Sequence, residues 1–144
     1  MIDDARVRAA VYDATTRTGR PPFVADLASA LKIDAAEVRE SLQRLAAARA
    51  LVLQRGGEIL MANPFSAVPT PFRVVAGSLS SFGNCIWDSL GIAAMLESDA
   101  VITTSCGDCG EAMQVHVTAD RVSGEGLLHF AIPARQWWDD IVFT

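Results

Sequence analysis

Apolar side chains in the first third of the chain recur at the spacing of a helix. Val7, Ala10, Val11 and Ala14 form one such face. The stretch ends at Thr18-Gly19, and a glycine just after the last helical residue is a common C-terminal signal. We therefore expect one helix that stops near residue 18 and a second, shorter helix over residues 23–31.

A third helix is predicted from Asp34 to about residue 48. Asp34 is a favourable N-cap, and Glu37 stands three residues later, which is the spacing of a capping box. The apolar stripe of this helix consists of Val38, Leu42 and Leu45. Two short strands, over 51–53 and 59–61, then flank a glycine turn.

Three helices followed by a hairpin are the order of a winged helix-turn-helix module, here residues 1–62. Such a module can bind DNA, or it can be reused as a packing unit. A third helix that reads DNA presents basic and amide side chains. Here the two basic residues of that helix are offset by Asp34, Glu37 and Glu40, so nucleic acid is not an expected partner.

Residues 63–79 are predicted to be a proline-rich connector. Three prolines, Pro64, Pro69 and Pro71, fall within eight residues. Because proline lacks a backbone N–H and restricts the residue before it, this stretch cannot form a regular helix and favours extended backbone.

The remaining residues, 80–144, predict a helix followed by strands. The helix covers 85–96, and strands are expected over 100–105, 112–118, 127–132 and 141–143, with a glycine-bearing turn at 106–110. The predicted fold class is therefore α+β, with a winged-helix-like module before a helix and a mixed, mainly antiparallel sheet.

The composition excludes several classes of protein. Of the 144 residues, 51% are hydrophobic and 20% are charged, which is enough apolar material for a folded core. The net charge of −5 argues against strong binding to phosphate backbones. No apolar stretch approaches the ~20 residues that span a bilayer, and the N-terminus has no secretory signal. We expect a cytoplasmic protein with no membrane partner and three reduced cysteines.

Asn84-Cys85-Ile86-Trp87-Asp88 is the sharpest local chemical pattern. Cys85 would lie in the first turn of its helix, where free amides favour a thiolate, and Asp88 would share its face. A soft nucleophile beside a carboxylate suits covalent chemistry, or capture of a soft metal with proton transfer by the acid. The alternative is a buried cysteine beside a helix-capping aspartate, and spacing alone favours that structural interpretation.

Cys106 and Cys109 form a Cys-x-x-Cys in the predicted turn. A structural zinc site needs four ligands, and Cys85, His116 and His129 are the other soft or imidazole candidates. A complete zinc site is therefore not expected, and the pair either stabilises the turn or accepts a soft metal. The adjacent Trp137 and Trp138 could wall a pocket, or could divide into one core and one surface residue.

Several separate segments, in order, resemble the alkylmercury lyase family, the organomercurial lyases. They are Gly83-Asn84-Cys85-Ile86-Trp87-Asp88-Ser89-Leu90-Gly91, Thr104-Ser105-Cys106-Gly107-Asp108-Cys109-Gly110-Glu111, His129-Phe130-Ala131-Ile132-Pro133-Ala134-Arg135 and Trp137-Trp138-Asp139-Asp140-Ile141-Val142-Phe143-Thr144. The connector also resembles that of some members, so the resemblance extends over nearly the whole chain.

The resemblance implies protonolysis of carbon–mercury bonds, which yields a hydrocarbon and Hg(II). It assigns Cys85 as the thiolate that attacks mercury and Asp88 as the acid that relays a proton to the departing carbon, so both would contact mercury transiently. No cofactor is required, Hg(II) is the bound product, and the partners are a small organomercurial and a thiol donor that removes Hg(II). Cys106 and Cys109 would be structural or auxiliary thiols.

The resemblance also implies a second essential cysteine after the Trp-Trp-Asp-Asp segment. This chain has Thr144 there and then ends. We therefore expect a C-terminally truncated member whose domain over 80–144 is incomplete. The alternatives to a lyase are a non-catalytic protein that binds mercury or another soft metal through thiols, and a winged-helix metal-responsive regulator.

Overall fold

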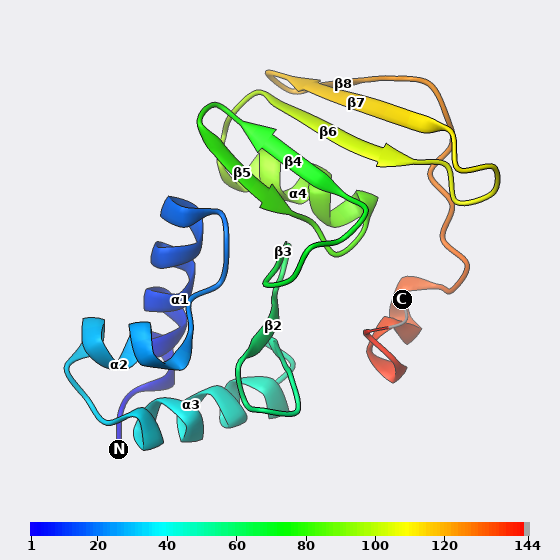
Figure 1. The fold of residues 1–144 in the computed structure, drawn as a ribbon. Helices are drawn as coiled ribbons and strands as arrows, with labels where there is room; N and C mark the ends of the chain where they lie inside the picture. The colour runs from blue at the N-terminus through cyan, green and yellow to red at the C-terminus, as the bar shows by residue number, and fades with distance from the viewer. Residues whose placement is uncertain (143–144) are drawn as a thin grey trace.

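Three helices form the N-terminal part of the protein because each of them buries an apolar stripe. In the computed structural model, which describes residues 1–142, they are α1 (Asp4–Thr18), α2 (Val24–Leu31) and α3 (Ala35–Ala47) (Figure 1). Their stripes meet in one core with the hairpin that follows: Val7, Val11, Val24, Leu27, Val38, Leu42, Leu45, Leu51, Ile59 and Ala62. The three predicted helices are confirmed.

The helix ends show which local signals were correct. Gly19 follows α1 with a φ of 80°, and its N–H donates to the Thr15 carbonyl at 2.8 Å, as the glycine signal predicts. Asp34 does occupy the N-cap position of α3, but its side chain makes no capping hydrogen bond. The predicted capping box is therefore wrong there, and the bond from an N3 carboxylate occurs at α2 instead, where Asp26 accepts from the Phe23 N–H at 3.1 Å.

The predicted hairpin is present and continues into a third strand. β1 (Val52–Leu53), β2 (Ile59–Ala62) and β3 (Phe65–Ser66) form an antiparallel sheet in that order. β3 lies within the stretch expected to be a connector, and its Phe65 is fully buried.

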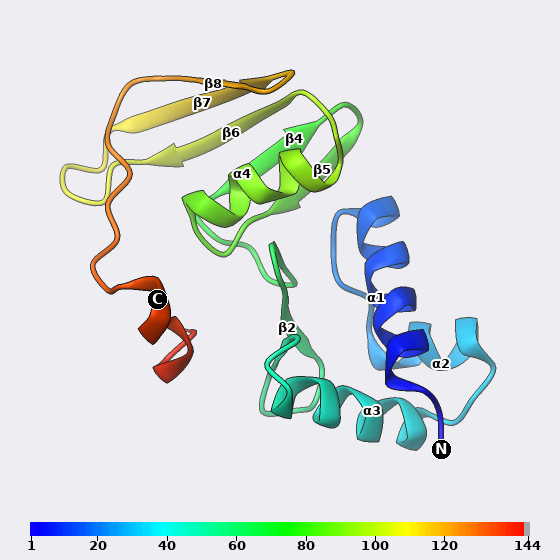
Figure 2. The same ribbon diagram turned by 180° about the vertical axis from the view of Figure 1, so that it is seen from behind.

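A second, five-stranded sheet forms the C-terminal part. Its strand order is β5-β4-β6-β7-β8, and every pairing is antiparallel. The strands are β4 (Arg73–Ala76), β5 (Leu79–Phe82), β6 (Ala100–Ser105), β7 (Ala112–Thr118) and β8 (Arg121–Ser123). Helix α4 (Ile86–Met95) covers one face of this sheet (Figure 2). Strands β6 and β7 and helix α4 confirm their predictions, whereas β4, β5 and β8 were not predicted.

The strand predicted over 127–132 is wrong. These residues have no regular structure, and Leu127 is 99% exposed. Gly124 and Gly126 precede the segment with φ values of 150° and 127°, which turn the backbone away from strand geometry. The chain then forms a 3-10 helix, η1 (Ala134–Asp139). Of the last predicted strand, residues 141–142 form a turn, and residue 143 lies outside the described residues.

The sheet and α4 enclose a core of their own: Phe65, Val74, Ala76, Ile92, Ala93, Ala100 and Ile102. In the sequence, the buried residues of the N-terminal core end at Ala62, and those of the second core begin at Phe65. The division into a module over 1–62, a connector over 63–79 and a domain over 80–144 stays a prediction, although β3 and β4 show that the middle stretch contributes strands.

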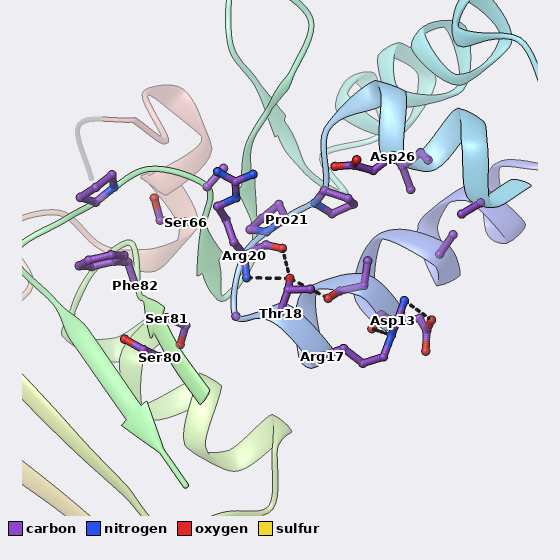
Figure 3. Close-up of a pocket in the computed structure, with 18 residues that line it drawn as sticks. Asp13, Arg17, Thr18, Arg20, Pro21, Asp26, Ser66, Ser80, Ser81 and Phe82 are labelled. Carbon is purple, nitrogen blue, oxygen red and sulfur yellow. Dashed lines mark hydrogen bonds and ion pairs between the residues drawn. The ribbon is translucent and has the colours of Figure 1, made fainter. Parts of the chain in front are cut away.

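The two parts touch at the end of α1. A β-carbon at Gly19 would collide with the Ser80 carbonyl of β5, so glycine is needed there for close approach as well as for its backbone angle. Beside this contact lies a cleft of about 730 Å³, lined on one side by α1 and α2 and on the other by β3 and β5 (Figure 3).

Removal of core volume from the five-stranded sheet should destabilise the protein. Ile102→Ala is expected to lower the free energy of unfolding by about 2–5 kcal/mol, because Ile102 is fully buried. The matched control, Leu127→Ala, should change it by less than about 0.5 kcal/mol. Urea unfolding followed by tryptophan fluorescence checks both, and equal effects would contradict the assigned core.

Candidate functional site

The start of α4 places Cys85 and Asp88 together. Cys85 is the N-cap residue of α4, one position before the predicted first turn, and its backbone is extended (φ −149°, ψ −178°). Its Sγ accepts a hydrogen bond from the Asp88 N–H at 3.4 Å. The sulfur thus takes the part of an N-cap oxygen, which ties it to the residue that carries the neighbouring carboxyl group.

Burial favours the neutral, protonated form of the Cys85 side chain. Removal of the side chain from water raises the pKa of Cys85, and the negative charge of Asp88 raises it further. Hydrogen bonds from the backbone of Asp88 and Trp87 act in the opposite direction, but burial is the larger influence. The helix terminus therefore does not produce the thiolate that the sequence pattern alone favours.

Asp88 is half-buried, and the side-chain amide of Asn84 donates a hydrogen bond to its carboxylate. Burial raises the pKa of Asp88, and the hydrogen bond from Asn84 lowers it. Asn84 Nδ2 lies 2.9 Å from Asp88 Oδ2, and it also lies 3.1 Å from Asn63 Oδ1. The Asn84 Oδ1 atom is buried and has no hydrogen-bond partner among the described residues. Asn84 thus links the Asp88 carboxylate to Asn63, which lies between β2 and β3.

The N-terminal helices also reach this site. The Tyr12 hydroxyl of α1 donates to the Asn63 carbonyl at 2.8 Å, and Asn63 in turn accepts from Asn84. Burial raises the pKa of Tyr12, and the charge of Asp88 contributes to the increase. The phenol therefore lies within electrostatic range of the Asp88 carboxylate.

Cys85 and Asp88 line a cavity of about 480 Å³. Its other lining residues include Met61, Asn63, Phe72, Asn84, Trp87, His129, Phe130, Ile132, Trp137 and Trp138. The lining is mostly apolar and aromatic, with a few polar groups gathered at the start of α4, as is common for small-molecule sites.

Three aromatic rings form one wall of this cavity. Phe130 packs edge-on against Trp87 with ring centroids 6.1 Å apart, and its centroid lies 5.5 Å from that of Trp137. The Trp137 indole N–H donates to the Ile132 carbonyl at 2.9 Å. Trp138 also lines the cavity, with the Arg49 guanidinium 6.0 Å from its ring centroid. Both tryptophans are half-buried at this pocket, so the pocket-wall interpretation is the one the structure supports.

The other candidate residues lie apart from this cavity or only at its edge. Cys106 and Cys109 are free cysteines in the turn between β6 and β7, and neither lines the cavity. His116 is exposed on β7, whereas His129 is exposed but lines the cavity. Within residues 1–142, no group of three or more histidine, cysteine or acidic side chains is arranged to hold a metal ion.

Sequence reasoning did not find the polar link of Asn63, Asn84 and Tyr12. Asn84 stands beside Cys85 in the chain, but long-range packing decides that its amide reaches a carboxylate and that Tyr12 lies near it.

The larger cleft of Figure 3 has no cysteine or histidine in its lining. Its two arginines are engaged, Arg17 with Asp13 at 3.3 Å and Arg20 over the Phe23 ring at 4.3 Å.

The charge of Asp88 should control the reactivity of Cys85. Asp88→Asn removes a negative charge that raises the pKa of Cys85, so alkylation of Cys85 by iodoacetamide should begin at lower pH than in the parent protein. Peptide mass spectrometry over a pH series measures this. Asp120→Asn, in an exposed turn, is the control and should not shift the profile; a profile unchanged by Asp88→Asn would disprove the coupling.

The Asn84 amide should hold down the pKa of Asp88. Asn84→Ala removes the hydrogen bond that stabilises the carboxylate, so the pKa of Asp88 should rise above its value in the parent. Carboxyl-carbon NMR titration measures it, with Asp120 as an internal reference. A fall in the Asp88 pKa, or no change, would show that Asn84 does not stabilise the charged form.

The positions of these groups can be compared with known proteins. The model of the alkylmercury lyase family matches residues 65–144, which contain α4, the five-stranded sheet and all three cysteines. A solved structure of the mercury-bound form of MerB2 is similar with a TM-score of 0.65 and 21% identity. No curated protein matches the chain.

The likeness to MerB2 covers 83% of this chain and 58% of that one, so this chain spans little more than half the length of that structure. At 21% identity the likeness shows a shared α+β fold with antiparallel sheets. The family match extends over more than half of the sequence and includes the segment with Cys85 and Asp88. The chain therefore belongs to the alkylmercury lyase family.

Proposed function

We propose that this protein cleaves the carbon–mercury bond of organomercurials by protonolysis and releases a hydrocarbon and Hg(II). The observation that carries the proposal is the geometry at the start of α4. The chain belongs to the alkylmercury lyase family, and the Cys85 sulfur accepts a hydrogen bond from the Asp88 backbone N–H. Both residues line a cavity of about 480 Å³ with aromatic walls. The family match and this geometry favour a lyase over a metal-responsive regulator.

Cys85 captures mercury and Asp88 moves the proton. The Cys85 thiol passes its proton to the Asp88 carboxylate as the sulfur binds mercury, and mercury keeps the thiolate ligand with which the organomercurial entered. Asp88 then gives this proton to the carbon, and the electron pair of the carbon–mercury bond becomes the new C–H bond. The raised pKa of Asp88 supports this order, because it helps the carboxylate take up the proton and hold it until the carbon accepts it.

A second sulfur for mercury comes from a small thiol in this proposal. Among the cavity-lining residues that the structure describes, Cys85 carries the single thiol, and Met61 adds a thioether. Thr144, where the resemblance implies a second cysteine, lies outside the described residues. An organomercurial that enters as its thiolate adduct brings the second sulfur, and a thiol donor then removes Hg(II). No cofactor takes part.

The N-terminal module supports the site and does not read DNA in this proposal. Its three helices and hairpin are winged-helix-like in order, and Tyr12 and Arg49 approach the cavity from it.

No helix within residues 1–142 combines the length and apolar character needed to cross a membrane. We infer a cytoplasmic location, where small thiols are abundant.

Hydrocarbon release should depend on both residues. With phenylmercuric acetate and excess small thiol, the parent protein should release benzene, Cys85→Ala should release none, and Asp88→Asn should be slower by about 100-fold or more. Gas chromatography measures the benzene.

Asp120→Asn is the matched control for Asp88→Asn and should keep the parent rate. Stoichiometric mercury binding by the parent protein without benzene would disprove the lyase and leave a thiol protein that sequesters mercury. Equal rates for the parent and Asp88→Asn would remove Asp88 from the proton path.

A further inference from the structure

Cys106 and Cys109 are held in one closed turn at the end of β6. The Cys106 N–H donates to the Glu111 carbonyl at 2.8 Å, and the Gly110 N–H donates to the Cys106 carbonyl at 2.9 Å. Both cysteines are free, Cys106 half-buried and Cys109 exposed. The backbone thus closes the turn, and a side-chain hydrogen bond between Cys109 and Cys106 shows that the two thiols lie near each other.

The turn directs hydrogen-bond donors at the Cys106 sulfur. The backbone amides of Cys109 and Asp108 and the Cys109 thiol lower the pKa of Cys106. This is the opposite of Cys85, whose pKa burial raises. The turn therefore favours a sulfur that gives up its proton, which is the form that binds metals.

The strand register places this turn at the same edge of the sheet as the start of α4. Arg73 of β4 pairs with Phe82 of β5 on one side and with Thr103 of β6 on the other. Cys85 follows Phe82 by three residues, and Cys106 follows Thr103 by three. Adjacent strands are about 4.8 Å apart, so Phe82 of β5 and Thr103 of β6 are about 10 Å apart. Strands β5 and β6 lie on either side of β4 and run in the same direction (Figure 1).

The number of donors limits which ion the pair can hold. Zinc and iron sites in proteins are usually completed by four ligands. No third histidine, cysteine or acidic side chain joins the pair within residues 1–142. Two thiolates alone satisfy an ion that prefers two soft ligands, and Hg(II) is such an ion.

We propose that Cys106 and Cys109 form a second, dithiol site that binds Hg(II) through both sulfurs. Binding forms two S–Hg bonds and releases two protons, with no change of oxidation state. The site accepts the Hg(II) released at Cys85, and this acceptor role rests on the proposed function. In that transfer the Cys106 and Cys109 sulfurs replace Cys85 and the small thiol on mercury, and the displaced sulfurs take up the protons.

Mercuric chloride tests the site without any lyase activity. In a Cys85→Ala background, dialysis against excess 2-mercaptoethanol should leave about one mercury per chain by metal analysis. Adding either Cys106→Ser or Cys109→Ser should weaken binding by about 100-fold or more, because a chelating second thiol acts at high effective concentration. Ser105→Ala, beside the same turn, is the control and should retain the mercury. Zinc chloride should not be retained.

The proposal is overturned if either single serine variant binds mercury within a few-fold of the Cys85→Ala protein, or if that protein binds no mercury against the competing thiol. A second arm adds phenylmercuric acetate to the parent protein and locates mercury by peptide mass spectrometry. Mercury on the peptide with Cys106 and Cys109 supports the acceptor role, and mercury confined to Cys85 overturns it. If no benzene appears, the lyase proposal fails, while the mercuric chloride result still decides the dithiol site.

Discussion

The hydrogen bond from the Asp88 amide to the Cys85 sulfur determines how the site is built. It can form because Cys85 stands outside the helix with an extended backbone while Asp88 is already within the first turn. The Ser89 hydroxyl also donates to the Cys85 carbonyl at 2.8 Å, so the N-cap residue is held from two directions. At Gly83 a β-carbon would collide with Ser89, which explains a glycine two residues before the cysteine. The spacing between thiol and acid is therefore a local property of one helix end.

The surroundings of this helix end come from distant parts of the chain. Asn63 follows the N-terminal core, yet its side chain accepts from Asn84 and its carbonyl accepts from Tyr12. Arg49 lies over Trp138 near the other end of the chain. A local pair of groups thus becomes a cavity because the N-terminal helices and the segment after β8 both close around it. The burial that raises the pKa values of Cys85 and Asp88 depends on this closure.

This contrast explains what the sequence could predict. Helix spacing and the glycine after α1 are local signals, and so are the alternating strands β6 and β7, and these were located correctly. β4 was hidden by the prolines before it, although it is an internal strand of the sheet that pairs with the nearby β5 and with the more distant β6. Leu127 and its neighbours have strand-like composition, but they pair with no strand within residues 1–142. The Cys85 and Asp88 pair was visible from its spacing, whereas the Asn84 link was not.

The burial of Cys85 also changes the chemical meaning of its position. A cysteine at a helix start is expected to favour its thiolate, but here the loss of water around the sulfur outweighs the amides. A protonolytic enzyme benefits from that result, because the hydrocarbon product needs one proton and a thiol that keeps its proton brings it into the site with the sulfur. At Cys106, which is also half-buried, hydrogen-bond donors have a larger effect than burial, and the pKa of this thiol is lowered. The two sulfur positions lie at the same end of one sheet, and burial has the larger effect on the thiol pKa at Cys85, whereas hydrogen-bond donors have the larger effect at Cys106. This difference suits the first to the proposed bond cleavage and the second to the proposed binding of a released cation.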